Sequence, residues 1–229
     1  MNSDPLVRYL MRLPTLITFF FSVMLVTFFR ELATVFDLTT NPNFDASTPA
    51  DALILVSFLA TLFFVVAVWL AYSLLIERFP YTLDYGVFYF DVARFSVLYL
   101  IFSFAFFSGH PPSYIYYLVV LVLWHLMMVG WHAYRLRHID GIERAERRAD
   151  MRGHMVRMAT YLVIAIAYVL FVVRTWSLAQ PWAVHSLLVM LTSTLLVFWN
   201  ARRLNNVRHK ALEASKAAEV ARASLAAGV

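Results

Sequence analysis

Between Ala52 and Ile76 the chain has no charged side chain, and this run constrains the fold more than any other feature of the sequence. A helix needs about 20 apolar residues to cross about 30 Å of hydrocarbon. Inside that layer a segment must satisfy its own backbone hydrogen bonds, which a single helix does. The run is also far longer than an ordinary buried strand. It therefore predicts a membrane-spanning helix.

Composition indicates that the rest of the chain has the same character. The 229 residues are 62% hydrophobic and 14% charged, with a mean hydropathy of +0.69, whereas soluble domains carry about 25% charged residues. We predict an all-α polytopic membrane protein, a bundle of six transmembrane helices with short loops, a cytoplasmic helical hairpin between helices 4 and 5, and a helical C-terminal tail. The predicted spans are 14–37, 51–76, 84–108, 113–134, 156–177 and 181–202. They form a domain over 1–203, followed by an alanine-rich tail over 204–229.

Local signals fix several of the predicted boundaries. Thr48-Pro49-Ala50-Asp51 supplies an N-cap hydroxyl, a proline at the first helical position and an acid three residues after the cap. Gly109-His110-Pro111-Pro112 predicts a tight turn between the third and fourth spans. The first span could be read as a signal peptide, but the run is too long and Arg30-Glu31 interrupts its far end.

The distribution of Lys and Arg predicts the orientation. Of the 19 basic residues, Arg174 alone falls on one face, Arg30 and Arg94 fall within spans, and the others share the opposite face. Basic segments resist translocation, so the arginine-rich face is predicted to be cytoplasmic. With six spans, both termini lie on that side of a plasma membrane or bacterial inner membrane.

Two cytoplasmic segments are candidates for binding. The loop 135–155 is interpreted as an extension of the fourth helix that turns back near Gly153, and the tail as a weakly amphipathic or frayed helix. Solvated, topology-setting arginines explain most of the loop. The alternative is a surface for anionic lipid or a cytosolic protein partner. Its candidate residues are Arg135, Arg137, Arg144, Arg147, Arg148 and Arg152.

Ionisable residues inside spans are costly, and so they are the candidates for a functional site. The candidate pathway residues are Asp91, Arg94, His125, His132, Glu31 and Arg30. Interfacial anchoring with local pairing explains many of them. Asp91 and Arg94 are three residues apart and can pair. Counted from the turn near His110, Asp91 is level with His132 and Arg94 with His125, which predicts a proton- or ion-handling cluster if the third and fourth helices are neighbours.

Other classes of site have less support in the sequence. His125 and His185 lie at different predicted depths, which argues against bis-histidine haem b, and we expect no cofactor. The absence of cysteine excludes disulfides and thiolate ligands, and the remaining ligand spacings predict no metal site. No hydrolase, nucleotide-binding or potassium-filter motif is present, so no enzyme activity is expected. The basic balance is explained by topology and anionic lipid, and no nucleic-acid partner is expected.

The sequence leaves two hypotheses for function. The first is a small oligomeric channel or transporter-like pore for a small ion such as the proton, lined by the third and fourth spans. The second is a non-catalytic membrane subunit or anchor that docks a cytosolic partner through the basic loop and the tail. In either case a homo-oligomer is expected.

Overall fold

The computed structural model describes residues 18–19, 21–23, 25–27, 30, 48–78, 85–137 and 142–227. Within these ranges the chain is almost entirely helical and contains no strand. Five segments are long and apolar enough to cross a membrane: Pro49–Ser73, Tyr89–Gly109, Tyr114–Arg135, Arg144–Val173 and Trp182–Asn206. These helices support the prediction of a membrane protein. The predicted span 14–37 falls largely outside the described residues, although those described within it are helical. The sixth crossing therefore stays a prediction.

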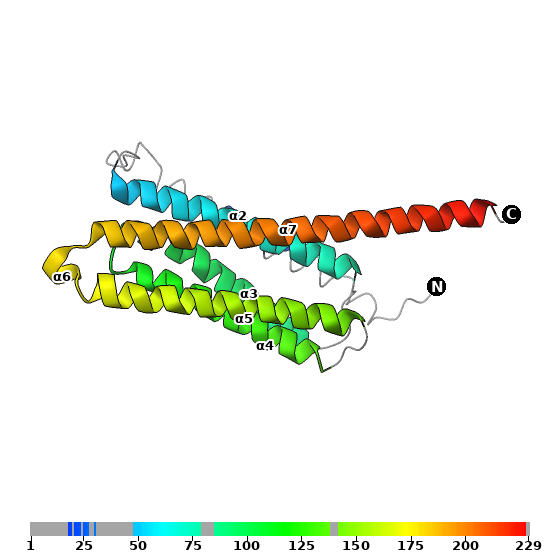
Figure 1. Ribbon diagram of the computed structural model, residues 1–229, viewed down its shortest axis with the longest axis horizontal. Coiled ribbons are helices and arrows are strands. Elements are labelled where there is room, and N and C mark those ends of the chain that lie inside the picture. The colour runs from blue at the N-terminus through cyan, green and yellow to red at the C-terminus, as the bar shows by residue number, and fades with distance from the viewer. Residues whose placement is uncertain are drawn as a thin grey trace.

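The described helices form an elongated bundle (Figure 1). In chain order they are α2 (Pro49–Arg78), α3 (Tyr85–Phe104), the 3₁₀ turn η1 (Ala105–Gly109), α4 (Tyr114–Arg135), α5 (Ile142–Tyr168), the π-helical turn η2 (Val169–Val173), α6 (Trp176–Ala179) and α7 (Trp182–Ala227). The closest packing is between α4 and α5 and between α2 and α7. We call the end that carries the short helix α6 the α6 end. The opposite end, where α4 ends and α5 begins, is the arginine-rich end.

The start of α2 has the predicted capping geometry. The Thr48 hydroxyl accepts a hydrogen bond from the Asp51 backbone N–H at 3.3 Å and donates one to the Asp51 carboxylate at 2.8 Å. One otherwise unpaired N–H group at the helix start is thereby satisfied. The predicted turn between the third and fourth spans is also present, at residues 110–113.

A glycine allows η1 to approach α2 closely. A Cβ at Gly109 would lie 2.6 Å from Ile54 Cδ1 and 3.0 Å from the Ala50 carbonyl oxygen. The neighbouring Ser108 hydroxyl donates a hydrogen bond to the Leu53 carbonyl across the same contact. Because no side chain fits at residue 109, glycine holds the turn directly against α2.

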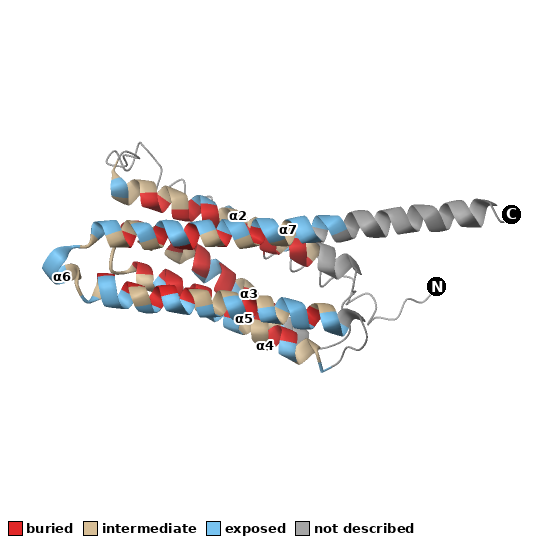
Figure 2. Ribbon diagram, in the orientation of Figure 1, coloured by how far each residue is buried: buried red, intermediate tan, exposed pale blue. Residues whose placement is uncertain are grey.

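The long helices of the bundle carry both buried and exposed residues along their length (Figure 2). Large side chains such as Tyr117, Trp124 and Tyr161 are at most 1% exposed. Large apolar side chains also point outward: Phe171 is 59% exposed and Val163 is 64% exposed. An apolar surface of this kind is typical of a helix bundle that is solvated by lipid.

One predicted turn is wrong. The chain does not turn back near Gly153, because α5 begins at Ile142 and passes through that residue without a break. The fifth span was predicted to start at 156 because the arginines before it were interpreted as a solvated loop. In fact one face of this charged segment is buried, with Arg147 4% and His154 3% exposed. The last helix, α7, runs without a break from Trp182 to Ala227, so the predicted tail is helical as far as it is described, and the domain boundary at 203–204 stays a prediction.

Candidate functional site

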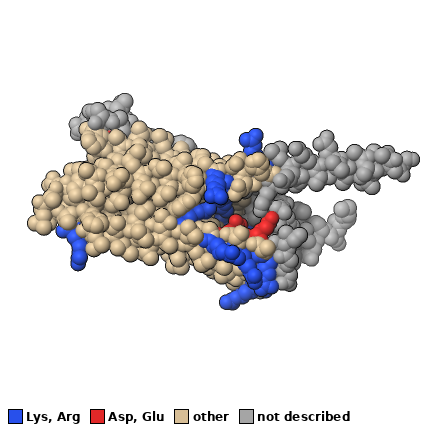
Figure 3. Space-filling model, in the orientation of Figure 1, with Lys and Arg blue, Asp and Glu red and all other residues tan. Residues whose placement is uncertain are grey.

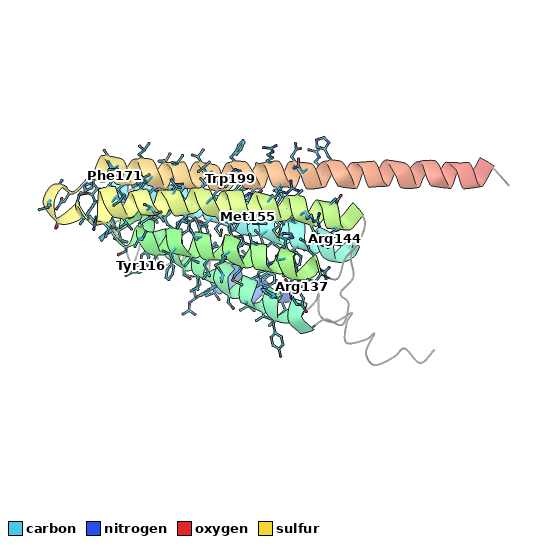
Figure 4. The ribbon with its side chains drawn as sticks, turned by 60° about the horizontal axis from the view of Figure 1, so that its bottom comes forward. Tyr116, Arg137, Arg144, Met155, Phe171 and Trp199 are labelled. Atoms are coloured by element: carbon cyan, nitrogen blue, oxygen red, sulfur yellow. The ribbon has the colours of Figure 1, made fainter. Side chains whose placement is uncertain are left out.

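The charged side chains of the described bundle gather at its arginine-rich end (Figure 3). Figure 4 marks the two ends: Arg137 and Arg144 lie at the arginine-rich end, and Tyr116 and Phe171 lie toward the α6 end. Within the bundle, polar side chains begin among the arginines and continue along α4, α5 and α7. The site is therefore best described from the arginine-rich end inward.

The first element of the site is a buried ion pair on α3. Arg94 Nη1 donates a hydrogen bond to Asp91 Oδ1 at 3.0 Å, and the two side chains are 5% and 2% exposed. The Tyr72 hydroxyl on α2 donates to the other carboxylate oxygen at 3.1 Å. The predicted pairing of Asp91 with Arg94 is confirmed. Both carboxylate oxygens are thus engaged by groups on two helices.

The second element is Trp131 on α4, whose indole ring is approached by three guanidinium groups. The Cζ atoms of Arg94, Arg135 and Arg147 lie 5.3, 5.7 and 5.1 Å from its ring centroid. Arg94 comes from α3, Arg135 from the end of α4 and Arg147 from α5, so the ring joins three helices. Guanidinium groups bind the negative faces of aromatic rings, which offsets part of the repulsion among them.

The third element is a cluster of three histidines between α4 and α5. His125 Nδ1 and His154 Nδ1 lie 2.9 Å apart, close enough for one to donate a hydrogen bond to the other. The ring of His132 lies 5.4 Å from that of His154, and both of its nitrogens are buried without a hydrogen-bond partner among the described residues. His125 also stacks on Tyr161, with centroids 5.4 Å apart and ring planes 7° apart.

The predicted cluster of the third and fourth helices is present only in part. The two helices pack as neighbours, and Arg94 contacts both Trp124 and Trp131, which precede His125 and His132 in the sequence. No hydrogen bond joins Asp91 to His132: Asp91 is engaged by Arg94 and Tyr72, and neither nitrogen of His132 has a hydrogen-bond partner in the described part of the chain. The direct partner of the α4 histidines is instead His154 on α5.

Sequence reasoning missed the contribution of α5. Arg147, His154, Tyr161 and Tyr168 follow one another at intervals of seven residues, and each is at most 4% exposed. A seven-residue interval returns a helix to nearly the same face, so these side chains form one buried polar stripe. The signal was present in the sequence. It was overlooked because His154 had been assigned to a solvated loop.

The polar stripe continues to the α6 end of the bundle. His185 Nε2 donates a hydrogen bond to the Ser108 carbonyl at 2.7 Å, so the Nδ1 of a neutral ring accepts the Tyr168 hydroxyl, which lies 2.9 Å away. Tyr114 on α4 packs against Tyr168 with centroids 5.5 Å apart. We call the following set the His–Tyr column: His132, His154, His125, Tyr161, Tyr168 and His185.

The remaining predicted site residues are distributed differently. Arg147 is buried and Arg135 half-buried, whereas the other candidates in the basic segment are exposed; these are Arg137, Arg144, Arg148 and Arg152. Arg30 is exposed, and Glu31 lies outside the described residues. Among the described side chains, no group of three or more His, Asp or Glu residues is arranged to hold a metal ion.

The arrangement offers two kinds of chemistry. Histidine and tyrosine both donate and accept hydrogen bonds, which is the property that a proton relay needs, and clustered guanidinium groups are typical of anion sites. A search of protein-family models, of curated proteins and of solved structures found no match to the chain.

Proposed function

We propose that the protein conducts protons across a membrane along the His–Tyr column. The observation that carries the proposal is the buried polar stripe of α5, joined to α4 by the His125–His154 contact and to α7 by the Tyr168–His185 contact. A polar group in the apolar interior of a membrane protein is costly and is usually retained for function. Here a whole series of such groups lies along one line.

The polar stripe is long enough to cross the hydrocarbon layer of a membrane. From Arg147 to Tyr168 a helix rises about 31 Å at about 1.5 Å per residue, close to the hydrocarbon thickness of about 30 Å. The described interior beside the stripe is filled by large rings, including Tyr114, Tyr117 and Trp124, each at most 1% exposed. A packed interior leaves little room for a hydrated metal ion with its whole water shell, whereas a proton needs only donors, acceptors and single bridging waters within reach. The proposal therefore replaces the predicted ion pore of the third and fourth spans with a proton path along α4, α5 and α7.

The column needs water to become continuous. Tyr161 and Tyr168 are one heptad apart, about 10 Å along the helix axis. The hydroxyl of Tyr161 is buried and has no hydrogen-bond partner among the described side chains. Buried polar groups without a protein partner commonly bind water, and bridging waters that start from this hydroxyl would close the gap.

The same proposal includes the orientation of the chain. The arginine-rich end would face the cytoplasm, and Arg174 at the α6 end would face the opposite side. With the first predicted span included, both termini are then cytoplasmic. Because the column lies within one protomer, proton conduction does not require the expected homo-oligomer, and it involves no enzymatic step.

Proton flux into liposomes provides the test. Purified protein is reconstituted with a pH-sensitive dye inside the vesicles, and a potassium gradient with valinomycin drives proton entry. Tyr161→Phe removes one buried hydroxyl, and His154→Phe breaks the histidine pair; both are expected to reduce flux at least tenfold. The matched control is Tyr116→Phe, because Tyr116 lies on α4 and is 57% exposed. Flux equal to that of protein-free vesicles, or flux unchanged by both column variants, would refute the proposal.

A second candidate function is supported by the length of α7. The helix runs from Trp182 to Ala227, but its apolar segment ends at Asn206. The rest projects beyond the bundle (Figure 1). A projecting helix favours the alternative of a membrane anchor that binds a cytosolic protein. In that case deletion of 208–229 would abolish co-purification of the partner and leave proton flux unchanged.

A further inference from the structure

We infer that the arginine-rich end contains a binding site for a phosphate group, formed between the helices around Trp131. The site is formed by Arg94 on α3, Trp131, His132 and Arg135 on α4, Arg147 on α5, and Arg203 on α7. Arg94, Arg135 and Arg147 contact the Trp131 ring. Arg203 lies within electrostatic range of His132, Arg94 and Arg147. The inference concerns ligand binding and does not depend on proton conduction.

Unpartnered donors define the kind of ligand. Arg94 Nε, Arg135 Nε and Trp131 Nε1 are buried and have no hydrogen-bond partner among the described residues. All three atoms carry a hydrogen and can only donate. A buried donor without an acceptor costs about 1–3 kcal/mol, so three of them around one ring favour a ligand rich in acceptor oxygens. The two unpartnered nitrogens of His132 lie beside them.

The charge balance indicates that this ligand is an anion. Four arginines form the site, and a fifth, Arg157, acts electrostatically on Arg203 while its guanidinium lies over the ring of Trp199. Among the described side chains, the nearby carboxylates are Asp91, which is paired with Arg94, and Asp150, which acts on Arg157 and Arg203. Glu146 also lies nearby, next to Arg147 on α5. With these three carboxylates counted, positive charge exceeds negative charge among the described side chains.

Phosphate fits this environment better than a metal cation or a singly charged halide. Two neighbouring histidines such as His125 and His154 can hold a metal cation, but the nearby arginines would repel it. A phosphate group presents several acceptor oxygens to guanidinium groups from different directions, and such charge-assisted hydrogen bonds are about twice as strong as neutral ones. It can come from the headgroup of an anionic lipid or from a phosphate-containing solute in the cytosol, since both would meet the bundle at this end.

The test uses the full chain purified in a neutral detergent. One arm measures binding of inorganic phosphate by calorimetry, with sodium chloride of equal ionic strength as the reference. The other arm adds phosphatidylglycerol or phosphatidylcholine to the micelles and counts retained lipid by native mass spectrometry. Arg147→Gln and Arg203→Gln remove site residues. Their exposed sequence neighbours provide the matched controls Arg148→Gln and Arg202→Gln.

We expect phosphate, phosphatidylglycerol or both to bind, and each site variant to weaken binding about tenfold to a hundredfold, the cost of one charge-assisted hydrogen bond. The control variants should change binding less than about twofold, since exposed charges are screened. Binding of inorganic phosphate assigns the site to a solute, and binding of phosphatidylglycerol alone assigns it to a lipid headgroup. Equal losses in site and control variants, or no preference for either phosphate compound, would overturn the inference. If Arg147→Gln elutes as aggregate, Arg203→Gln and Arg135→Gln decide the result.

Discussion

Replacing Asp91 by Asn tests the electrostatic account of the buried ion pair. The asparagine side chain keeps the size of the carboxylate and can still accept one hydrogen bond, from Arg94 or from Tyr72. The change therefore removes mainly the negative charge. Arg94 would then remain almost fully buried, its side chain 5% exposed, without a counter-ion.

The expected cost can be worked out from this burial. Removing one partner of a buried ion pair costs about 3–5 kcal/mol, because the other charge is left uncompensated. For a chain of this length that corresponds to a fall in melting temperature of roughly 6–20 °C. Ring contacts of Arg94 with Tyr72, Trp124 and Trp131 would retain part of its stabilisation, so the lower half of the range is expected.

A double variant separates charge from packing. Asp91→Asn combined with Arg94→Gln removes both charges. The double variant should therefore lose less stability than Asp91→Asn alone. Thermal unfolding in one detergent, followed by intrinsic tryptophan fluorescence, measures four proteins: the parent, Asp91→Asn, Arg94→Gln and the double variant. The reasoning is wrong if Asp91→Asn melts with the parent protein, or if the double variant loses the sum of the two single losses.

Three further predictions concern the fold and its orientation. Gly109→Ala should lower thermal stability by about 1–3 kcal/mol, because its Cβ would overlap Ile54. The control is Gly130→Ala, which should be neutral or stabilising because the nearest neighbour of its Cβ is Phe90 at 3.9 Å. A reversed order of the two melting temperatures would contradict the packing. Thr48→Ala should cost about 1 kcal/mol by removing the cap of α2, with Thr160→Ala as the control for hydroxyl loss within a helix and equal losses as the contrary result. Because the chain has no native cysteine, Arg137→Cys and Arg174→Cys each carry a single thiol and should react with an impermeant reagent from opposite sides of the membrane; labelling of both from one side would refute the orientation.

The sequence predicted helix type and most helix positions because lipid imposes a simple rule. A long apolar run must be helical, and proline and glycine mark its ends. The start of α2 at the Thr48 cap and the turn at residues 110–113 followed from these rules. The pairing of Asp91 with Arg94 followed as well, since residues three apart face each other on any helix.

The histidine site could not be predicted in the same way, because its key contact joins residues 29 positions apart. Spacing on α4 identified His125 and His132, but it carried no information about which helix packs against them. The segment from Arg144 to Arg152 was predicted to be solvent-exposed because of its many charged residues. The seven-residue interval from Arg147 through His154 to Tyr161 indicates a buried face instead. In this segment periodicity was the better guide.

The geometry of the histidine pair also limits how fast protons could pass. In a neutral pair joined through Nδ1 atoms 2.9 Å apart, one ring donates from Nδ1 and the other accepts there, so their Nε2 atoms have opposite protonation. A proton that arrives at the bare Nε2 of one ring can release another from the Nε2 of its partner. Both tautomers are then inverted, and the rings must reset before a second proton can follow in the same direction. Because the ring of His125 is stacked against Tyr161, this reset requires local repacking. Proton flux should therefore saturate as the driving gradient increases, as in a transporter, and flux that rises in proportion to the gradient over its whole range would argue against the pair as the relay.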